Sequence, residues 1–309
     1  MESNYWAIII NPKSGKKSFR KQQKFLFLKL KHAGIEFEYR ITHFAGHATK
    51  IAQNYIEKGI QNILVLGGDG TMSEVINGIF SANIKDTSSL KIALIPRGTG
   101  NDWARFWGLT TDNKLSIDVF LKGKIQHIDI GKVLYNMEGK QETHYFVNSV
   151  GMGLDAAVVN LTHRLKSILG SHSILYTIAL LGAVFSYKSH KVKIISDEKI
   201  ISDSMFTMNV ANGCYSGGGM KQNPNALPYD GLLDVMMAKK PTFIDILSAL
   251  TRLFNAKLLE LPVIESFQSK KIEVQSNEAA LLEADGIIVN GFSPFFISII
   301  PNAIQMIVP

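Results

Sequence analysis

Apolar and polar residues are arranged in two different ways along the first third of the chain. Short apolar runs predict buried strands, and residues 35–41, where apolar and polar side chains alternate strictly, predict one more. Longer segments carry apolar side chains at helical spacing, which predicts amphipathic helices. The expected strands are 5–12, 35–41, 62–66 and 91–96, and the expected helices are 16–34, 47–59 and 72–80. This alternation of strand and helix predicts a parallel sheet covered by helices.

The pattern changes after about residue 125. Strand-like stretches then follow one another, interrupted by two helical runs near 154–187 and 242–258. A series of consecutive strands predicts a second, β-rich domain. The sequence has no repeat or low-complexity linker between the two parts, so the boundary rests on this change of pattern alone.

The composition narrows the class of protein. With 46% hydrophobic and 19% charged residues among 309, the chain can bury a large core in one large or two medium domains. A net charge of +7 favours anionic partners, which are nucleic acids, anionic lipid headgroups or small anions. The sequence lacks a zinc finger, an aromatic RNA-binding pattern and a basic heptad region, so we expect no nucleic acid partner.

Other features indicate a compartment. A single cysteine, Cys214, excludes an intramolecular disulfide framework and a cysteine-rich metal site, which fits a reducing environment. The first residues lack the basic region and cleavage site of a signal peptide. The longest apolar run, 174–187, is shorter than the roughly 20 residues that span a bilayer as a helix. We therefore expect a cytoplasmic protein that is soluble or peripherally associated with a membrane.

Residues 66–75, LGGDGTMSEV, place three glycines and one aspartate between a predicted strand and a predicted helix. Glycines there let backbone N–H groups approach a ligand, and the helix N-terminus adds partial positive charge, which suits phosphate. A carboxylate beside phosphates makes sense if Asp69 reaches Mg²⁺ or accepts a proton from an attacking hydroxyl. An ordinary tight turn with Asp69 as the helix N-cap is the open alternative.

Two more glycine-containing turns follow predicted strands. They are NPKSGKK at 11–17 and IPRGTGND at 95–102. Neither a Walker loop nor the dinucleotide fingerprint G-x-G-x-x-G fits any of the three turns. Because the turns end strands of one parallel sheet, they are expected to converge on one ligand. The three together favour a nucleotide-phosphate site of another kind.

These motifs carry a family resemblance. NPKSG, GGDGTMSEVINGI and IPRGTGNDWAR, in this order, resemble the catalytic domain of the diacylglycerol kinase and sphingosine kinase superfamily, above all its soluble bacterial branch. The resemblance continues through VNSVGMGLDAAV, NGCYSGGGMKQNPNALPYDGLLDV, ADG and the tail IIPNAIQMIVP, so it covers nearly the whole chain.

The resemblance implies an α/β nucleotide-binding domain and a larger β-rich sandwich domain, with the end of the chain returning to the first. We expect an ATP-binding domain at 1–125 together with about 300–309, and a lipid-substrate domain at 126–299. The implied activity is transfer of the γ-phosphate of ATP to a hydroxyl of a lipid such as diacylglycerol or a sphingoid base, at a membrane surface. A homodimer is left open.

The resemblance also assigns residues to ligands. Magnesium is expected at the side chain of Asp230 and the backbone carbonyls of Leu227 and Leu232, and hard cations do take oxygen ligands. An ordinary Asp-Gly turn is the alternative there. The residues expected to bind ATP are Asn11, Pro12, Lys13, Ser14, Gly15, Thr42, Gly67, Gly68, Asp69, Gly70, Thr71, Met72, Ser73, Glu74 and Thr99.

One position departs from the family pattern, whose late motif is usually D-G-E. Here Asp285-Gly286 is followed by Ile287, which cannot accept a proton. The expected catalytic carboxylates are then Asp69, Asp285 and Glu283. On one strand, residues 283, 285 and 287 would share a face, so Glu283 could partly replace the missing carboxylate.

Several alternatives stay open at this point. Ile287 is compatible with a weakened lipid kinase or with a non-catalytic lipid- or nucleotide-binding protein of the same fold. An NAD kinase or phosphofructokinase relative would also use a GGDG turn, but GTGND and ALPYDGLLDV argue against it. The apolar run 161–187 is either a core helix or one wall of a cleft for acyl chains.

Overall fold

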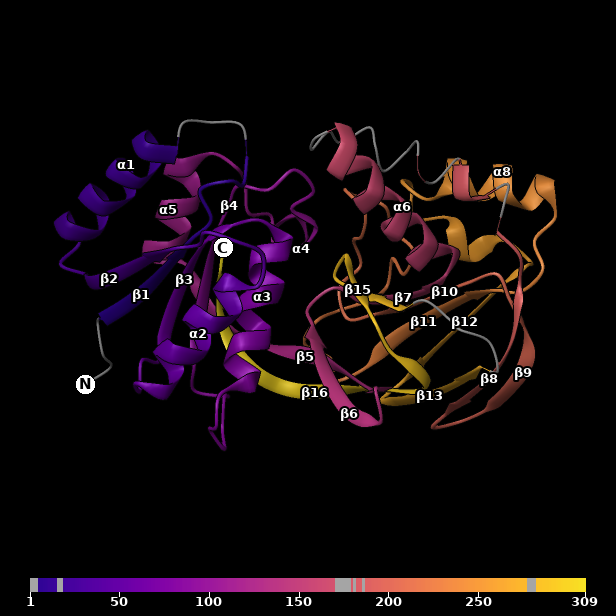
Figure 1. Ribbon diagram of the computed structural model, residues 1–309. Coiled ribbons are helices and arrows are strands. Elements are labelled where there is room, and N and C mark those ends of the chain that lie inside the picture. Colours follow the sequence, from indigo (N-terminus) through magenta and orange to yellow (C-terminus); the bar gives the residue numbers. More distant parts are fainter. Residues whose placement is uncertain (1–4, 16–18, 170–178, 180–181, 185–186, 277–281) are drawn as a thin grey trace. The chain divides into compact units, whose positions relative to one another are not determined.

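The computed structural model describes residues 5–15, 19–169, 179, 182–184, 187–276 and 282–309. The chain divides into two compact units, Met1–Ile128 with Asn302–Pro309, and Asp129–Pro301. Figure 1 colours the chain from indigo to yellow, so the yellow C-terminal residues can be followed back among the indigo and purple elements of the first unit. Two strands, β5 (Lys124–Met137) and β16 (Phe292–Val308), contain residues of both units.

The first unit is built on a parallel sheet. Its strands are β1 (Tyr5–Ile10), β2 (Glu36–Ile41), β3 (Asn62–Gly67) and β4 (Lys91–Pro96). They lie in the order β2-β1-β3-β4, and the C-terminal part of β16 adds a further parallel strand beside β4 through Gln305 and Met306. β3 is buried along its whole length, which explains its continuous apolar sequence.

Helices accompany this sheet, and four of them lie in two pairs. The helices are α1 (Phe19–His32), α2 (His47–Glu57), α3 (Asp69–Ser81), α4 (Asp102–Phe106) and α5 (Asn113–Lys122). α1 lies against α5, and α2 lies against α3. Leu26 and Leu30 of α1 and Phe120 of α5 share one core with Ile8 of β1 and Leu64 of β3. The apolar faces of these helices and strands therefore pack together in one buried layer.

The second unit is a β-rich sandwich that also contains helices. One sheet has the antiparallel order β12-β11-β10-β7-β14-β15, and the other has β13 between β16 and β8, with β9 beyond β8 and the hairpin β5–β6. The remaining bounds are β6 (Lys140–Phe146), β7 (Ser149–Gly153), β8 (His190–Ser196), β9 (Ile200–Met205), β10 (Thr207–Ala211), β11 (Leu233–Ala238), β12 (Ile264–Ser269), β13 (Lys271–Ser276), β14 (Leu282–Ala284) and β15 (Ile287–Val289).

Alternate residues of both sheets form the core of this unit. Val192 and Ile194 of β8 point into the same buried cluster as Val235 and Met237 of β11. The helices are α6 (Leu154–Leu169) and α8 (Phe243–Arg252), followed by the 3₁₀ turn η1 (Leu258–Glu260). Because side chains alternate along each strand, each sheet has one apolar face, and these two faces pack together as a sandwich.

The predicted fold class, an α/β domain with a parallel sheet followed by a β-rich sandwich domain, is confirmed. The expected domain limits and the roles given to the two domains stay predictions.

Of the apolar run 161–187, residues 170–178, 180–181 and 185–186 lie outside the described residues. Within the described part, Leu161 and Leu165 pack against a buried cluster that includes Val158 and Phe206. Within the part of the chain that the structure describes, helices are too short or too polar to cross a membrane.

Candidate active site

Three loops of the first unit lie side by side at the carboxyl ends of β1, β3 and β4. Asn11 Nδ2 donates a hydrogen bond to Thr71 Oγ1 at 3.0 Å, which ties the loop after β1 to α3. The backbone N–H groups of Asn11 and Arg97 donate to the carbonyls of Leu66 and Gly67 at 3.0 and 2.7 Å. The three glycine-containing turns noted in the sequence are therefore neighbours at one edge of the sheet.

The glycines of these loops serve two purposes. A Cβ on Gly68 would lie 2.7 Å from the Cα of Gly98, and a Cβ on Gly67 would lie 2.6 Å from the Cβ of Thr71. A side chain at Gly68 would push two loops apart, and one at Gly67 would displace Thr71. A Cβ on Gly70, in contrast, would meet no described atom within 4 Å. The first turn of α3 is thus open to an approaching ligand.

The N-terminus of α3 faces this open space. The helix begins at Asp69, three residues earlier than expected, with Gly68 as its N-cap residue. Gly68 has no side chain with which to cap the first amide groups. The alternative in which Asp69 is the N-cap of α3 is therefore wrong. An uncapped helix N-terminus with glycines in front of it favours an anion.

The carboxylate of Asp69 fastens two of the loops together. Its Oδ2 accepts a hydrogen bond from the amide of Asp102, and its Oδ1 accepts one from Trp103, both at 3.1 Å. These amides belong to the start of α4. Burial raises the pKa of Asp69, while the hydrogen bonds from the amides oppose this rise. Its expected role at Mg²⁺ or as a proton acceptor stays a prediction.

A buried arginine, absent from the sequence-based set, holds the loop after β1. Arg97 donates from Nε and Nη2 to the carbonyl of Ser14 at 3.2 and 3.1 Å, and from Nη1 to Gln22 Oε1. Its guanidinium also lies 5.7 Å from the ring centre of Phe19. Gly15 has φ +76°, and a Cβ there would lie 2.4 Å from the carbonyl oxygen of Arg97. Glycine is thus required where the loop turns back over Arg97.

Two other expected residues connect neighbouring elements. The Oε1 and Oε2 atoms of Glu74 accept hydrogen bonds from the amides of Gly46 and Ala48 at 2.8 and 3.0 Å, at the start of α2. The amide of Thr42 donates to the carbonyl of Ile10 at 2.8 Å, which places Thr42 at the end of β2 beside the loop after β1. Glu74 therefore ties α3 to the start of α2, and its expected place behind a nucleotide loop stays a prediction.

The remaining expected residues differ in exposure. Lys13 and Thr99 are exposed at the loop surfaces, and Pro12 is half-buried. Met72 and Ser73 are buried within α3, where their side chains contact the interior of the unit. The assignment of all these residues to ATP stays a prediction.

In the second unit, Asp285 holds a tight turn between β14 and β15. Asp285 and Gly286 both have positive φ, 49° and 79°, as the two residues of a hairpin turn do. The carboxylate of Asp285 accepts hydrogen bonds from the amides of Val147 (2.8 Å), Asn148 (2.9 Å) and Ser149 (3.2 Å). It thereby joins this turn to the start of β7.

Glu283 forms a buried carboxyl pair with Asp155. A Cβ on Gly151 would lie 2.5 Å from Asp155 Oδ2 and 2.6 Å from Glu283 Oε1, so both oxygens occupy the space above this glycine. Glu283 Oε2 accepts a hydrogen bond from the amide of Gly286 at 2.7 Å. Burial, and then the charge of Asp155, raise the pKa of Glu283 well above its usual value, and burial raises the pKa of Asp155. The pair therefore favours a state that retains a proton.

The expectation that residues 283, 285 and 287 share one strand face is wrong. The chain reverses at the hairpin turn that contains Asp285, so Glu283 and Ile287 lie on different strands. Glu283 is paired with Ile288, and Ala284 is paired with Ile287. Residues directly opposite in an antiparallel pair share a face. Glu283 and Ile287 therefore lie on opposite faces of this sheet.

The expected magnesium turn brings oxygen atoms and acidic groups together. Asp230 Oδ1 accepts a hydrogen bond from the amide of Leu232 at 3.0 Å, and Asp129 Oδ2 accepts one from Gly231 at 2.7 Å. Burial, and then the charge of Asp129, raise the pKa of Asp230. Within the described residues, His, Cys, Asp and Glu form no group of three or more suited to a metal. A cation here would relieve the repulsion between carboxylates and would use carbonyls, including that of Leu227, so the donor chemistry fits Mg²⁺.

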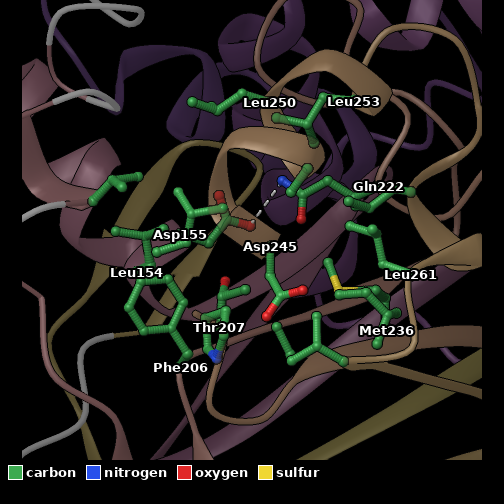
Figure 2. A pocket seen from close by; sticks show the side chains of 18 of the residues that line it. Leu154, Asp155, Phe206, Thr207, Gln222, Met236, Asp245, Leu250, Leu253 and Leu261 are labelled. Carbon is green, nitrogen blue, oxygen red and sulfur yellow. Dashed lines mark hydrogen bonds between the residues drawn. The ribbon is translucent and has the colours of Figure 1, made fainter. Parts of the chain in front are cut away.

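An apolar pocket opens within the second unit (Figure 2). Counted together with the open solvent at its mouth, its empty space is about 690 Å³. Side chains of α6, β10, β11, α8 and η1 line it. The apolar lining includes Leu154, Val158, Phe206, Met236, Leu250, Leu253, Leu258 and Leu261.

One end of the pocket is polar. Asp155 Oδ2 accepts hydrogen bonds from Asn209 Nδ2 at 3.0 Å and from Gln222 Nε2 at 3.3 Å, and the contact with Gln222 is drawn in Figure 2. Asp155 and Gln222 both line the pocket. Neither was singled out from the sequence, although Asp155 stands within VNSVGMGLDAAV, as the first carboxylate after a glycine-rich strand. The pocket thus combines a long apolar wall with a buried group that can exchange hydrogen bonds with a hydroxyl.

Comparison with known proteins identifies both units. A family model described as "Diacylglycerol kinase catalytic domain" matches residues 5–133, and one described as "YegS C-terminal NAD kinase beta sandwich-like domain" matches residues 148–308. The diacylglycerol kinase of Staphylococcus saprophyticus is 29% identical over 282 residues, covering 90% of this chain and 87% of the relative. That of Bacillus subtilis strain 168 is 28% identical over 281 residues, covering 90% and 88%.

Solved structures agree with this assignment. A candidate diacylglycerol kinase from Bacillus anthracis strain Sterne is 27% identical, with a TM-score of 0.80 and coverage of 100% of this chain and 98% of that chain. The yeast NADH kinase in complex with NADH has a TM-score of 0.58 at 12% identity and covers 99% and 83%, which is a likeness of fold alone. The catalytic-domain match argues for the lipid kinase interpretation over an NAD kinase or a non-catalytic binding protein. This chain belongs to the diacylglycerol kinase family, and it is a lipid kinase.

Proposed function

We propose that this lipid kinase transfers the γ-phosphate of ATP to a hydroxyl of a lipid taken from a membrane surface in the cytoplasm, with Mg²⁺ as the metal. Diacylglycerol is the first candidate, because relatives that cover most of the chain bear the name diacylglycerol kinase. A sphingoid base, which also presents a hydroxyl beside a long apolar chain, is the other candidate.

The first unit supports the nucleotide part of this proposal. The open N-terminus of α3, with Gly70 facing free space, suits the phosphates of ATP. The loop of Asn11–Gly15, held by Arg97, would lie along the same phosphates. Phosphoryl transfer depends mainly on positioning and on stabilisation of charge. The carboxylate of Asp69, which fastens two of these loops through backbone amides, would contribute by holding that arrangement.

The pocket of the second unit carries the lipid part. Its apolar wall suits acyl chains, and the carboxyl of Asp155 stands at its polar end. A carboxyl group whose pKa is raised by burial can donate or accept a hydrogen bond at a lipid hydroxyl. Glu283, paired with Asp155, would hold the proton that the pair retains, so that Asp155 accepts the hydrogen bond of the lipid hydroxyl.

The direct test is phosphate transfer from radiolabelled ATP to a panel of lipids in mixed micelles. Long-chain diacylglycerol, a sphingoid base and other hydroxylated lipids would be compared with and without Mg²⁺. We expect a labelled lipid product from at least one of them, dependent on Mg²⁺. ATP consumption without any labelled lipid would contradict the proposal.

A pair of variants tests the pocket. Leu250→Trp would fill it, whereas Leu115→Trp adds the same bulk to a side chain of α5 that is 56% exposed. With long-chain diacylglycerol we expect Leu250→Trp to lower turnover by about tenfold or more, since small misplacements of a reacting group are costly. Leu115→Trp should keep the wild-type turnover. Equal turnover in both variants would show that the acyl chains bind elsewhere.

A further inference from the structure

The helix α8 begins at a well-defined cap. Thr242 Oγ1 accepts a hydrogen bond from the amide of Asp245 at 3.3 Å, and Asp245 Oδ2 accepts one from the amide of Thr242 at 2.8 Å. These two contacts form a capping box, which fixes the start of the helix. Each residue of Phe243–Arg252 is nevertheless at least partly exposed. The helix is therefore locally stable and lies at the surface of its unit.

Apolar side chains occupy two adjoining faces of α8. One face, with Ile246, Ala249 and Leu250, lines the lipid pocket together with Leu253 just after the helix. The other, which we call the α8 outer face, consists of Phe243, Ile244, Leu247 and Phe254. At 100° per residue, Phe243, Ile244 and Leu247 fall within one 100° arc of the helix, and this arc adjoins the pocket-lining side, because Phe243 and Leu250 are seven residues apart.

The α8 outer face is exposed to an unusual degree for large apolar side chains. The exposed fractions are 56% for Phe243, 76% for Ile244, 46% for Leu247 and 64% for Phe254. A surface helix of a globular protein normally places polar residues on the side away from the core. A contiguous group of exposed apolar side chains indicates an interaction surface for another apolar body.

Positive charge stands at both ends of this face. Lys240 lies just before the helix, Lys257 lies just after it, and both are exposed. The whole chain carries a net charge of +7. An apolar helix face flanked by lysines fits the interface of a bilayer with anionic headgroups. The charge favours such a surface over a second copy of this basic chain.

We infer that the α8 outer face inserts into the interfacial region of an anionic lipid bilayer. The inserted face would then adjoin the pocket-lining face of the same helix, so that a lipid would pass from the bilayer to the pocket along α8. This inference rests on the proposed function for the identity of the pocket's ligand. It adds which surface meets the membrane and which headgroup charge it prefers.

Vesicle binding without ATP tests the inference separately from catalysis. The double variant Ile244→Gln/Leu247→Gln removes two apolar side chains while keeping good helix formers. Ile200→Gln is the matched control, because Ile200 is 64% exposed and lies on β9 instead of α8. The probe is sedimentation with vesicles of equimolar phosphatidylcholine and phosphatidylglycerol.

We expect the double variant to bind these vesicles on the order of 10²-fold more weakly than the wild type, since each apolar side chain contributes roughly tenfold. Ile200→Gln should bind as the wild type does. A second variant, Lys240→Glu/Lys257→Glu, should lose at least about tenfold, given roughly 1 kcal/mol per lysine near an anionic surface, and should lose little on pure phosphatidylcholine. Wild-type binding by both double variants, or an equal loss in Ile200→Gln, would overturn the inference.

Two further measurements separate the remaining outcomes. If sedimentation velocity shows a wild-type dimer that Ile244→Gln/Leu247→Gln converts to a monomer, with vesicle binding unchanged, the face contacts a second copy and the inference is wrong. Phosphorylation of a short-chain, water-soluble diacylglycerol reports catalysis without a membrane. Absence of that activity in the wild type would count against the proposed function, while α8-dependent vesicle binding would still support the inference.

Discussion

Replacing Glu283 with glutamine tests the buried carboxyl pair of the second unit. Glu283 Oε1 and Asp155 Oδ2 crowd the space above Gly151, where a Cβ would lie within 2.6 Å of either atom. Burial and the charge of Asp155 hold the pKa of Glu283 well above its usual value. An unfolded chain releases this proton near about pH 4.3, whereas the folded chain retains it to higher pH.

The sign of the pH dependence follows from the protons bound. Between the unfolded and folded pKa values, the folded state holds one more proton than the unfolded state. The free energy of unfolding of the wild type therefore falls as pH rises, by about 1.4 kcal/mol per pH unit for this group. The stabilisation is complete below the unfolded pKa and is lost as pH rises through the folded pKa.

Glutamine removes this dependence with little change of shape. Its carbonyl oxygen can still accept the hydrogen bond from the amide of Gly286, now 2.7 Å from Glu283 Oε2. Its NH₂ group can donate to Asp155. We expect Glu283→Gln and the wild type to have similar stability near about pH 4, and the variant to gain about 1.4 kcal/mol per pH unit relative to the wild type above about pH 4.5.

Urea unfolding followed by circular dichroism, from about pH 4 to about pH 8, measures this difference. Glu265→Gln is a control of opposite sign, because hydrogen bonds from Lys199 and Lys239 lower the pKa of Glu265. The stabilisation from its carboxylate is fully present above the unfolded pKa and is lost as pH falls through the folded pKa. Glu265→Gln should therefore be less stable than the wild type by an amount that stays constant from about pH 5 to about pH 8 and shrinks at lower pH. A constant difference between Glu283→Gln and the wild type over the whole range would refute the carboxyl-pair reasoning.

Three other predictions concern the expected site residues. Asp69→Ala should abolish lipid phosphorylation in the radiolabelled assay while the circular dichroism spectrum is kept, because the amides of Asp102 and Trp103 lose their acceptor; wild-type turnover would contradict its assignment. Asp230→Ala should lower the thermal midpoint more in Mg²⁺ buffer than in EDTA if the turn holds an ion, and equal losses would mean that it holds none. Ile287→Glu should raise lipid-dependent turnover, by about 10²-fold if a base is missing at this position, and unchanged turnover would show that the enzyme does not need one there.

The sequence determined the elements of the first unit because burial there follows local periodicity. The apolar run of β3 is buried along its length, and the helical spacing of α1 places Leu26 and Leu30 in the core. Adjacent parallel strands end at one edge, so the meeting of the three glycine-containing loops also followed from the sequence. The family motifs then indicated a lipid kinase, which the family models confirm.

The sequence contains a local turn signal at Asp285-Gly286 that contradicts the interpretation of 283–287 as one strand. Asp285-Gly286 stands between two apolar stretches, which is typical of a two-residue hairpin turn. Treating 283–287 as one strand placed Glu283 and Ile287 on a common face, whereas the hairpin places them on opposite faces. The sequence therefore contained the turn, but the position of Glu283 relative to its neighbours depended on the pairing of β14 with β7.

Tertiary structure alone decided which distant residues share one environment. Glu283 and Asp155 are far apart in the chain and meet only because β14 and α6 both lie against β7, above a glycine that leaves room for two carboxyl groups. The raised pKa values follow from that burial, which no local pattern contains. In the same way, periodicity showed that α8 is rich in apolar residues, but only the packed unit divides them between a pocket and an exposed face. Local sequence sets backbone conformation and amphipathicity, whereas burial and electrostatic coupling depend on long-range contacts that form only in the folded chain.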